Sequence, residues 1–237
     1  MRGHFLPDLW GHPRVGPCQL IHCMPRVIAI DGPAASGKSS VSRGVASALG
    51  FLFVSSGHFY RALAWGVARD NISEATLPEW IERSPLEVER TKEGVRLLLH
   101  GNDATPHLSD PEVAAKVSLL AIFPEVRDLI NERLRALAAT HDLVMEGRDI
   151  GSIVFPETPF KFYLDASPAV RARRRAGEGA VDSVAERDRI DSTRATAPLT
   201  IPKGATVIDT THLGLDEVIT SVLGHLQKSG AFPAISR

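Results

Sequence analysis

The stretch that decides the fold is VIAIDGPAASGKSS at residues 27–40. Its first part, Val27–Ile30, is apolar and β-branched, and Asp31-Gly32-Pro33 then breaks it, which indicates a buried strand ending in a loop. The rest, GPAASGKSS at 32–40, matches the pattern G-x-x-x-x-G-K-[ST]. From Lys38 to Leu49, small and apolar residues recur at helical spacing, and Gly50 is a good C-terminal stop. The stretch therefore predicts a strand, a glycine-rich loop and a helix in succession.

The glycine-rich loop predicts a phosphate-binding site. Glycines let backbone amides close around phosphate oxygens, and the following helix directs the positive end of its dipole at them. Lys38 would reach the β- and γ-phosphates of a nucleotide, and Ser39 would ligate magnesium. Such a loop alone does not separate a kinase from a switch GTPase or a motor ATPase. The N-K-x-D element that switch GTPases normally use for guanine is absent from this sequence.

Strand-like and helix-like segments alternate along most of the chain. Besides Val27–Ile30, strands are predicted at 51–54, 143–145, 160–164 and 207–208. Helices are predicted at 38–49, 59–68, 111–120, 124–139, 167–175, 181–194 and 215–226. This alternation predicts an α/β fold, a parallel sheet with helices on both faces. A hairpin predicted from 86–89 and 95–99 interrupts it, so residues 71–120 are interpreted as an inserted lobe.

Composition excludes several classes of protein. The chain has 237 residues, of which 43% are apolar and 23% charged, within the globular range. Its 27 basic residues balance 28 acidic ones, which excludes a strongly basic nucleic-acid coat protein. No apolar run approaches the length of a membrane-spanning helix. Its two cysteines, Cys18 and Cys23, form no disulfide framework, which suits a reducing cytoplasm. Residues 1–25 lack periodicity and are interpreted as a disordered leader.

Two further groups of residues follow predicted strands and could carry chemistry. EGRDIG at 146–151 follows an apolar strand, where ligands gather in doubly wound sheets, so Arg148 and Asp149 are candidates; the alternative is an ordinary surface ion pair. Ser56, Tyr60 and Arg61 follow the second strand and are a weak signal alone.

Two arginine-containing stretches could also carry chemistry, and each has a simpler explanation as well. In ERDRIDSTR at 186–194, Arg187, Asp191 and Arg194 would share one helix face, and a solvated, salt-bridged face is the alternative. RARRR at 171–175 has two interpretations: a helix end whose cations interact favourably with the helix macrodipole, or a group of arginines that binds a triphosphate.

Taken together, these motifs resemble those of bacterial cytidylate (CMP) kinases, in the P-loop nucleoside monophosphate kinase family. The resemblance runs from about Arg26 to the last helix. It rests on GPAASGKSS, SSGHFYRA at 55–62, FPEVR at 123–127, EGRDIGSIVFP at 146–156 and RDRIDSTRATAPL at 187–199. It implies a P-loop kinase fold with an inserted nucleoside-monophosphate lobe and a short lid. The core would span 26–70 and 121–237, with the lid at about 171–190.

The resemblance also implies cofactors, substrates and roles for individual residues. ATP would be the phosphoryl donor, with Mg²⁺ at Ser39, and CMP and dCMP the acceptors. The ATP-binding residues would be Gly32, Pro33, Ala34, Ala35, Ser36, Gly37, Lys38, Ser39 and Ser40, with Arg174 and Arg175 from the lid. Arg61, Arg148 and Arg194 would surround the transferring or accepting phosphates, and Ser56 and Tyr60 would also bind substrate. Cytosine would be read by Ser118, Arg127 and Asp149, and the ribose held by Arg187 and Asp191.

This chain departs from the family pattern at two places. Ser55 stands where the family usually has an acidic residue, so a carboxylate near the magnesium or the phosphates would be missing. The segment from Arg175 to Arg187 is also shorter than the usual lid.

The sequence as a whole predicts a cytoplasmic (d)CMP kinase. We expect it to act as a monomer on small molecules, with neither nucleic acid nor membrane as a partner. Lys38, Arg148 and Arg194 would be its catalytic residues. The alternatives are a P-loop kinase for another monophosphate, UMP above all, a binding or switch module without transfer activity, and a catalytically weak relative.

Overall fold

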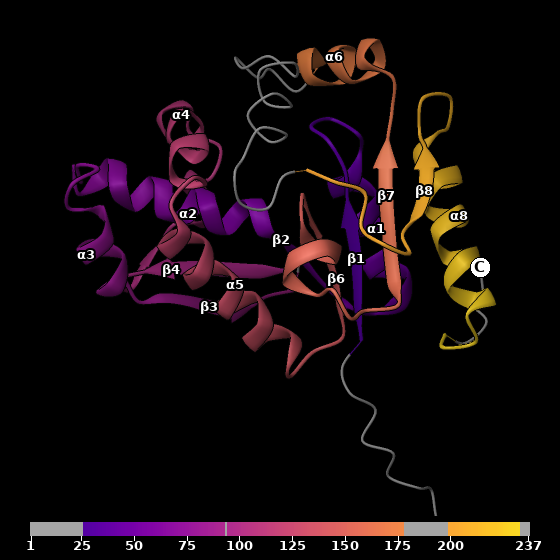
Figure 1. The fold of residues 1–237 in the computed structure, drawn as a ribbon, viewed down its shortest axis with the longest axis horizontal. Helices are drawn as coiled ribbons and strands as arrows, with labels where there is room; N and C mark the ends of the chain where they lie inside the picture. Colours follow the sequence, from indigo (N-terminus) through magenta and orange to yellow (C-terminus); the bar gives the residue numbers. More distant parts are fainter. Residues whose placement is uncertain (1–25, 93, 178–198, 233–237) are drawn as a thin grey trace, which may run out of the picture.

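A parallel five-stranded sheet forms the centre of the computed structural model, which describes residues 26–92, 94–177 and 199–232 (Figure 1). The strands stand in the order β2-β6-β1-β7-β8, and every neighbouring pair is parallel. Their bounds are β1 Val27–Asp31, β2 Leu52–Ser55, β6 Leu143–Gly147, β7 Phe160–Asp165 and β8 Thr206–Asp209. The predicted parallel sheet is therefore confirmed.

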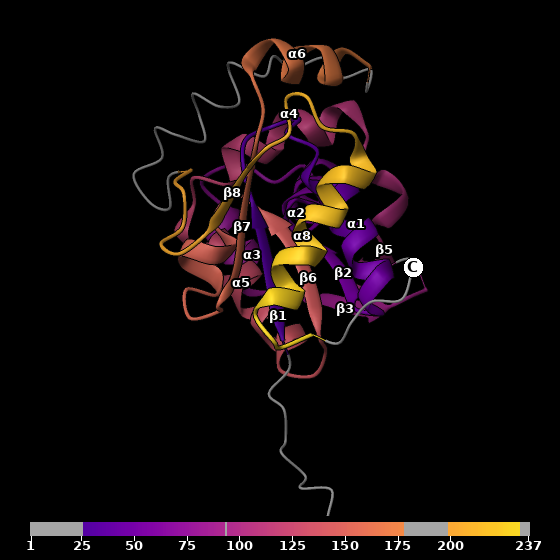
Figure 2. The same cartoon turned by 90° about the vertical axis from the view of Figure 1, so that its right-hand side faces the viewer.

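Helices cover both faces of this sheet, as predicted. The α-helices are α1 Lys38–Leu49, α2 Ser56–Arg69, α3 Leu77–Glu82, α4 Pro111–Leu120, α5 Pro124–Ala138, α6 Pro168–Gly177 and α8 Leu215–Lys228. Side chains of β1 alternate between two cores: Ile28 and Ile30 pack with α1 and α8, and Ala29 packs on the opposite side with α2 and α5. Figure 2 shows α8 beside α1 on their shared face.

Strand order brings three strand ends together at one edge of the sheet. Parallel pairing places Asp31 beside Gly147, and Ser55 beside Glu146. Because the carboxyl ends of parallel strands meet at the same edge, the segments that follow β1, β2 and β6 are neighbours in space. These segments, which include the first turns of α1 and α2, contain most of the residues that the sequence singles out.

A second, three-stranded sheet lies beside the helix α2. It consists of β3 Leu86–Arg90, β4 Val95–Leu99 and β5 Asn102–Asp103, and β3 and β4 form the predicted antiparallel hairpin. Strand β4 approaches α2 closely: a Cβ atom on Gly66 would lie 2.1 Å from Leu99 Cδ2. The short α3 was not predicted, because six residues give too little periodicity to detect.

The structure corrects the predicted start of α2. The sequence places this helix at 59–68, but it begins at Ser56, directly after β2. Ser55 has extended backbone angles (φ −103°, ψ 116°) and leads straight into the first helical turn. No apolar residue stands at 56–58, so the hydrophobic pattern gave no signal there. The earlier start places Ser56, Tyr60 and Arg61 in the first two turns of α2, next to the strand ends.

Two irregular helical turns complete the described chain. Thr105–His107 forms the 3₁₀ turn η1, and Ile150–Val154 forms the π-helical turn η2 immediately after β6. Single π-helical turns occur often at functional sites. No helix within the described ranges is long and apolar enough to span a membrane. The predicted leader at 1–25 and the predicted helix at 181–194 lie outside the described residues.

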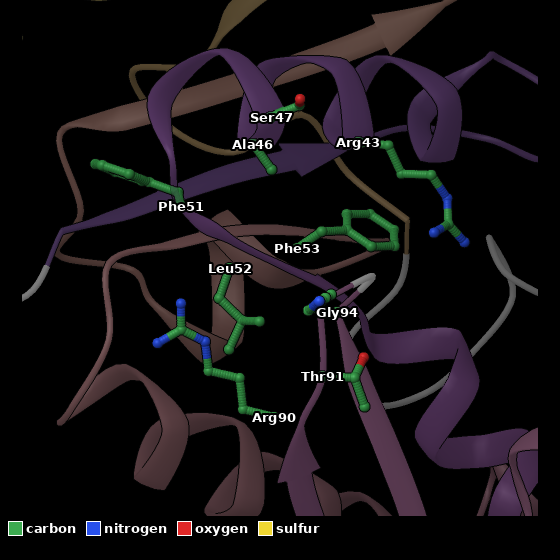
Figure 3. A pocket seen from close by; sticks show the side chains of 10 residues that line it. Arg43, Ala46, Ser47, Phe51, Leu52, Phe53, Arg90, Thr91 and Gly94 are labelled. Carbon is green, nitrogen blue, oxygen red and sulfur yellow. The ribbon is translucent and has the colours of Figure 1, made fainter.

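A hollow of about 260 Å³ lies between α1, the beginning of β2 and the β3–β4 turn (Figure 3). Its lining includes Arg43, whose guanidinium carbon lies 4.4 Å from the centroid of the Phe53 ring, and Arg90 from β3. None of the residues predicted to bind nucleotide lines it. The hollow is formed near the amino end of β2, whereas the glycine-rich loop follows the carboxyl end of β1.

Candidate active site

The glycine-rich loop between β1 and α1 has the backbone shape that a phosphate cradle needs. Gly32 (φ 149°) and Gly37 (φ 89°) both adopt positive φ, and a Cβ atom on Gly32 would lie 2.0 Å from the carbonyl oxygen of Leu164. Ala35 also has a positive φ of 56°, which is uncommon for a residue with a side chain. The loop curls tightly over β7 and ends at the amino terminus of α1, where the first backbone N–H groups have no partner within the helix and can bind an anion.

Two side chains, Ser36 in this loop and Lys38 at its end, indicate that the loop binds an anionic ligand. Lys38 is buried, and its Nζ donates a hydrogen bond to the carbonyl oxygen of Pro33 at 2.6 Å, so its charge is held beneath the loop. The hydroxyl of Ser36 is fully buried and has no hydrogen-bond partner among the described residues. An unsatisfied buried hydroxyl is costly unless a ligand pairs with it. Both features fit the polyphosphate of a nucleotide.

A buried carboxylate, Glu146 at the end of β6, faces the beginning of α1. The Ser39 hydroxyl donates to Glu146 Oε1 at 3.1 Å, and the Ser55 hydroxyl donates to the same oxygen. Burial opposes ionisation of Glu146, but Lys38, the Ser55 hydroxyl and Arg148 together hold its pKa below the ordinary value. Glu146 is therefore ionised at neutral pH.

The sequence analysis missed Glu146, although it quoted the EGRDIG segment that contains it. The signal that could have identified it is its place at the carboxyl end of a buried strand. The absence of an acidic residue at position 55 does not leave this edge without a carboxylate, because Ser55 is hydrogen-bonded to one. A hydroxyl and an ionised carboxylate are oxygen ligands of the kind that Mg²⁺ prefers, so Ser39 and Glu146 fit a magnesium site.

Arg127 and Asp149 form a buried ion pair at the same edge. Arg127 comes from α5, Asp149 follows β6, and Arg127 Nη2 donates to Asp149 Oδ2. Both residues are nearly inaccessible to solvent, with 5% and 8% of their surfaces exposed. The structure thus brings together two residues that the family resemblance assigns to cytosine. Arg148 lies between Glu146 and Asp149 in the chain and is half-buried.

The first turns of α2 lie over the end of β6. Ser56 is buried, and a Cβ atom on Gly147 would lie 2.5 Å from its hydroxyl oxygen. Tyr60 packs against the core, and Arg61 Nη1 donates to the carbonyl oxygen of Leu108 at 2.9 Å. Arg61 therefore links α2 to the segment that follows the small sheet.

Helix α6 supplies arginines to the other side of the glycine-rich loop. Arg171 is buried, and its Nη1 donates to the carbonyl oxygen of Ala34 at 3.4 Å. Arg174 donates to the hydroxyl and the carbonyl oxygens of Thr210, at 3.0 and 2.8 Å. A Cβ atom on Gly37 would lie 3.9 Å from Arg174 Nη1, which places this guanidinium beside the loop. Arg175 lies one residue further along α6 and is half-buried.

Arg171 and Thr210 are site residues that the sequence analysis did not assign. Thr210 follows β8, and its hydroxyl donates to the carbonyl oxygen of Ser36 at 3.1 Å. Its position directly after the last strand was the available signal. Arg171 belongs to the RARRR stretch that the sequence singled out, but its burial and its contact with Ala34, which separate it from the neighbouring arginines, depend on the tertiary structure.

The structure does not describe the side chains of four predicted site residues. Arg187, Asp191 and Arg194 lie outside the described residues, and so does the side chain of Ser118 on α4. The remaining predicted residues gather at the carboxyl edge of the sheet, on the loop between β1 and α1, on α1, α2, α5 and α6, and on the turn after β6.

Comparison with known proteins agrees with this arrangement. The family described as cytidylate kinase matches residues 28–228. The cytidylate kinase of Deinococcus radiodurans is 45% identical over 210 residues, covering 84% of this chain and 98% of that protein. The cytidylate kinase of Cutibacterium acnes is 42% identical over 212 residues, with 84% and 95% covered. That of Caldanaerobacter subterraneus subsp. tengcongensis is 39% identical over 216 residues, with 85% and 95% covered. A match of this extent, joined to the geometry at the sheet edge, shows that the chain belongs to the cytidylate kinase family.

Proposed function

We propose that this protein transfers the γ-phosphoryl group of ATP to CMP and dCMP, giving ADP with CDP or dCDP. The observation that carries the proposal is the adjacency of two loops. The phosphate-binding loop follows β1, and the turn containing Arg148 and Asp149 follows β6, its neighbour in the sheet. A donor nucleotide on the first loop and an acceptor nucleotide beside the second would meet at the same edge.

The donor side consists of the loop residues Gly32–Ser40 together with α6. Backbone amides of the loop and the Ser36 hydroxyl would bind phosphate oxygens, and Lys38 would leave Pro33 for the β- and γ-phosphates. Arg174 and Arg175 would cover the nucleotide from α6. Ser39 and Glu146 would hold Mg²⁺, which when bound neutralises charge on the phosphates.

The acceptor side consists of residues from α2, α5 and the turn after β6. Arg61 and Arg148, with Arg194 and the hydroxyls of Ser56 and Tyr60, would surround the acceptor phosphate. The small sheet and the helices around it, within residues 71–120, would form the nucleoside-monophosphate lobe. Arg187 and Asp191 would bind the ribose, and Arg174 and Arg175 would belong to the lid at about 171–190.

These residues act by positioning and by charge neutralisation. Phosphoryl transfer needs in-line alignment and compensation of the charge on the equatorial oxygens, which the lysine and arginines supply. The acceptor phosphate is already largely ionised near neutral pH, so no general base is expected to be needed. Closure of the lid would exclude water, which would otherwise hydrolyse ATP.

Cytosine recognition is assigned to the buried Arg127–Asp149 pair, with Ser118. An ionised carboxylate only accepts hydrogen bonds, so Asp149 suits the amino group of cytosine and repels the uracil carbonyl at the same position. Arg127 takes one carboxylate oxygen, Oδ2, and this pairing orients the other oxygen, Oδ1, for the base. Arg127 itself can donate to the acceptors O2 and N3.

Replacing Asp149 by asparagine is expected to lower the preference for CMP over UMP. In the parent, a site built for the cytosine amino group discriminates against UMP, which lacks that group, by roughly tenfold or more in kcat/KM. In the variant, the amide can turn its NH₂ group toward the uracil oxygen, so UMP is accepted better. The measurement is kcat/KM for both nucleotides in the parent and in Asp149→Asn. An unchanged ratio, with both rates reduced together, would show that Asp149 orients Arg148 or the metal instead of reading the base.

Replacing Asp191 by alanine is expected to impair CMP more than dCMP. The residue is proposed to bind the ribose, and loss of a buried hydrogen bond costs about 1–3 kcal/mol of transition-state stabilisation. Steady-state kinetics with both acceptors measure the difference. Equal losses of kcat/KM for the two nucleotides would instead assign Asp191 to a structural ion pair.

A panel of CMP, dCMP, UMP and AMP as acceptors, with ATP and Mg²⁺, tests the proposed function directly. The expected result is rapid ADP formation with CMP and dCMP only. A preference for UMP would identify a different monophosphate kinase, and slow ATP hydrolysis unaffected by CMP would indicate a binding or switch module. We further propose that the protein is a cytoplasmic monomer. Size-exclusion chromatography with light scattering tests the oligomeric state.

A further inference from the structure

Asp31, the last residue of β1, joins the two loops of the proposed site. Its side chain is completely buried. Oδ1 accepts a hydrogen bond from the backbone N–H of Ile150 at 2.8 Å, and Oδ2 accepts one from the N–H of Gly151 at 2.7 Å. The two partners lie 119 and 120 residues further along the chain, at the start of the π-helical turn η2.

The turn that Asp31 holds directly follows Arg148 and Asp149. The carbonyl oxygen of Asp149 accepts bonds from the amides of Ile153 and Val154, at 2.9 and 3.2 Å, so Asp149 belongs to the same hydrogen-bonded unit. Gly151 is packed closely on its other sides. An added Cβ atom would lie 3.2 Å from Asp31 Oδ2, 3.2 Å from Pro202 Cγ and 3.3 Å from Lys161 Cδ. A change at Asp31 therefore moves the backbone that carries Arg148 and Asp149.

Only a carboxylate satisfies both amides at this position. Its two oxygens each accept a bond from one N–H group, whereas an amide side chain offers a single acceptor and turns a donor toward the second N–H. Burial disfavours the ionised form and raises the pKa of Asp31 to about 6, although the two backbone hydrogen bonds favour ionisation. Among the described residues, the charged groups that act on it are Asp149, which raises this pKa, and Lys38, which lowers it.

We propose that Asp31 is a positioning residue for the acceptor nucleotide: by holding Ile150 and Gly151 it fixes Arg148 and Asp149 relative to the phosphate-binding loop, which begins at the next residue, Gly32. Asp31 contacts neither nucleotide. This inference rests on the proposed function, because it assigns to Arg148 and Asp149 the acceptor phosphate and base.

The variant that tests this role is Asp31→Asn. Misplacement of Arg148 and Asp149 is expected to reduce kcat/KM for CMP roughly 10- to 100-fold, mainly through a higher KM. ATP affinity, measured by calorimetry without CMP, is expected to match that of the parent. Amide hydrogen exchange of residues 148–155 is expected to become faster, because one of the two N–H groups loses its acceptor.

The melting temperature separates a positioning role from a merely structural one. The folded-state pKa of Asp31 lies above its ordinary value of 3.8, so the folded protein favours the protonated form. The stability that protonation contributes is therefore lost as the pH rises through about 6, and at pH 7 the ionised Asp31 opposes folding. Asp31→Asn removes this unfavourable charge but leaves one buried N–H group without an acceptor, so the variant is expected to melt close to the parent at pH 7, while it loses activity. At pH 5, where Asp31 is protonated in the parent, the two proteins should differ less in kcat/KM.

Asp142→Asn is the matched control. Asp142 precedes β6 and also accepts a backbone N–H bond, from Arg26 at 2.6 Å, but it lies at the opposite edge of the sheet. This variant is expected to melt at a lower temperature and to keep the parent's KM for CMP. The CMP phosphate also titrates near pH 6, so only the part of the pH dependence that disappears in Asp31→Asn is assigned to Asp31.

Gly151→Ala disturbs the same contact from the other side and should likewise raise the KM for CMP. Unchanged KM and exchange rates in Asp31→Asn would overturn the proposal, as would a fall in melting temperature with equal loss of ATP and CMP affinity, or failure of that variant to fold. If the parent phosphorylates no monophosphate, the proposed function fails first. The exchange rates of Ile150 and Gly151 then still decide whether Asp31 holds the turn.

Discussion

Lys38→Ala is expected to lower kcat for phosphoryl transfer about a thousandfold or more, since a cation aimed at the transferring phosphoryl group is the main source of charge compensation there. In the structure, the Lys38 ammonium group lies beneath the phosphate-binding loop, 2.6 Å from the carbonyl oxygen of Pro33, and is already buried. Its loss therefore removes a buried positive charge from beneath the loop that is proposed to bind the ATP phosphates.

CMP affinity should survive this substitution, because Lys38 faces the donor side of the site. Calorimetry of CMP binding without ATP measures it, and coupled ADP formation measures kcat. Lys228→Ala, at the end of α8, is the control for the loss of a lysine charge and should behave as the parent. A loss of CMP affinity as large as the loss of turnover would contradict the assignment of Lys38 to the ATP phosphates.

Glu146→Gln is expected to reduce turnover about a hundredfold and to raise the Mg²⁺ concentration needed for half-maximal activity. The buried carboxylate accepts hydrogen bonds from the hydroxyls of Ser39 and Ser55, and its charge is balanced by Lys38. A neutral amide keeps the size of the side chain but removes the negative charge. Titration of Mn²⁺ into the ATP complex, followed by electron paramagnetic resonance, measures metal affinity independently of turnover.

Ser55→Ala is the matched comparison for Glu146→Gln. It removes a hydrogen bond to Glu146 and leaves the charge in place, so its effect on metal affinity should be much smaller. Equal metal affinity in the parent and in Glu146→Gln would exclude Glu146 from the magnesium site. The residue would then serve only to balance Lys38.

Two of the buried acids at the sheet edge, Glu146 and Asp31, are expected to affect stability in opposite directions. The folded-state pKa of Glu146 lies below its ordinary value of 4.5, so its ionisation stabilises the protein at neutral pH, and this contribution is lost as the pH falls through the folded-state pKa. Glu146→Gln should therefore melt at a lower temperature than the parent at pH 7, with a smaller difference in acid. Asp31, whose pKa is raised, behaves in the reverse way. Thermal unfolding at several pH values measures both effects.

Structural features that depend on neighbouring residues in the sequence could be predicted. GPAASGKSS identifies its own strand, loop and helix, because the backbone angles of the glycines and the start of the helix depend on neighbours within the motif. The predicted start of α2 at residue 59 was wrong: the helix begins at Ser56, and hydrophobic spacing gives no signal there because residues 56–58 include no large apolar side chain. The turn Ile150–Val154 was missed because a π-helical turn has no periodic signature of its own.

The sequence by itself determined the phosphate-binding loop, the parallel sheet and the family resemblance, because each rests on short patterns or on the alternation of strand and helix. Only the tertiary structure decided which strand ends are neighbours. Pairing of β6 with β1 and β2 places Glu146 at Ser39, 107 residues away in the chain, and Ile150 at Asp31, 119 residues away. Periodicity determines which face of a strand is buried, but the order of buried parallel strands depends on packing across the whole domain. The contacts between these residues could therefore not be read from the sequence.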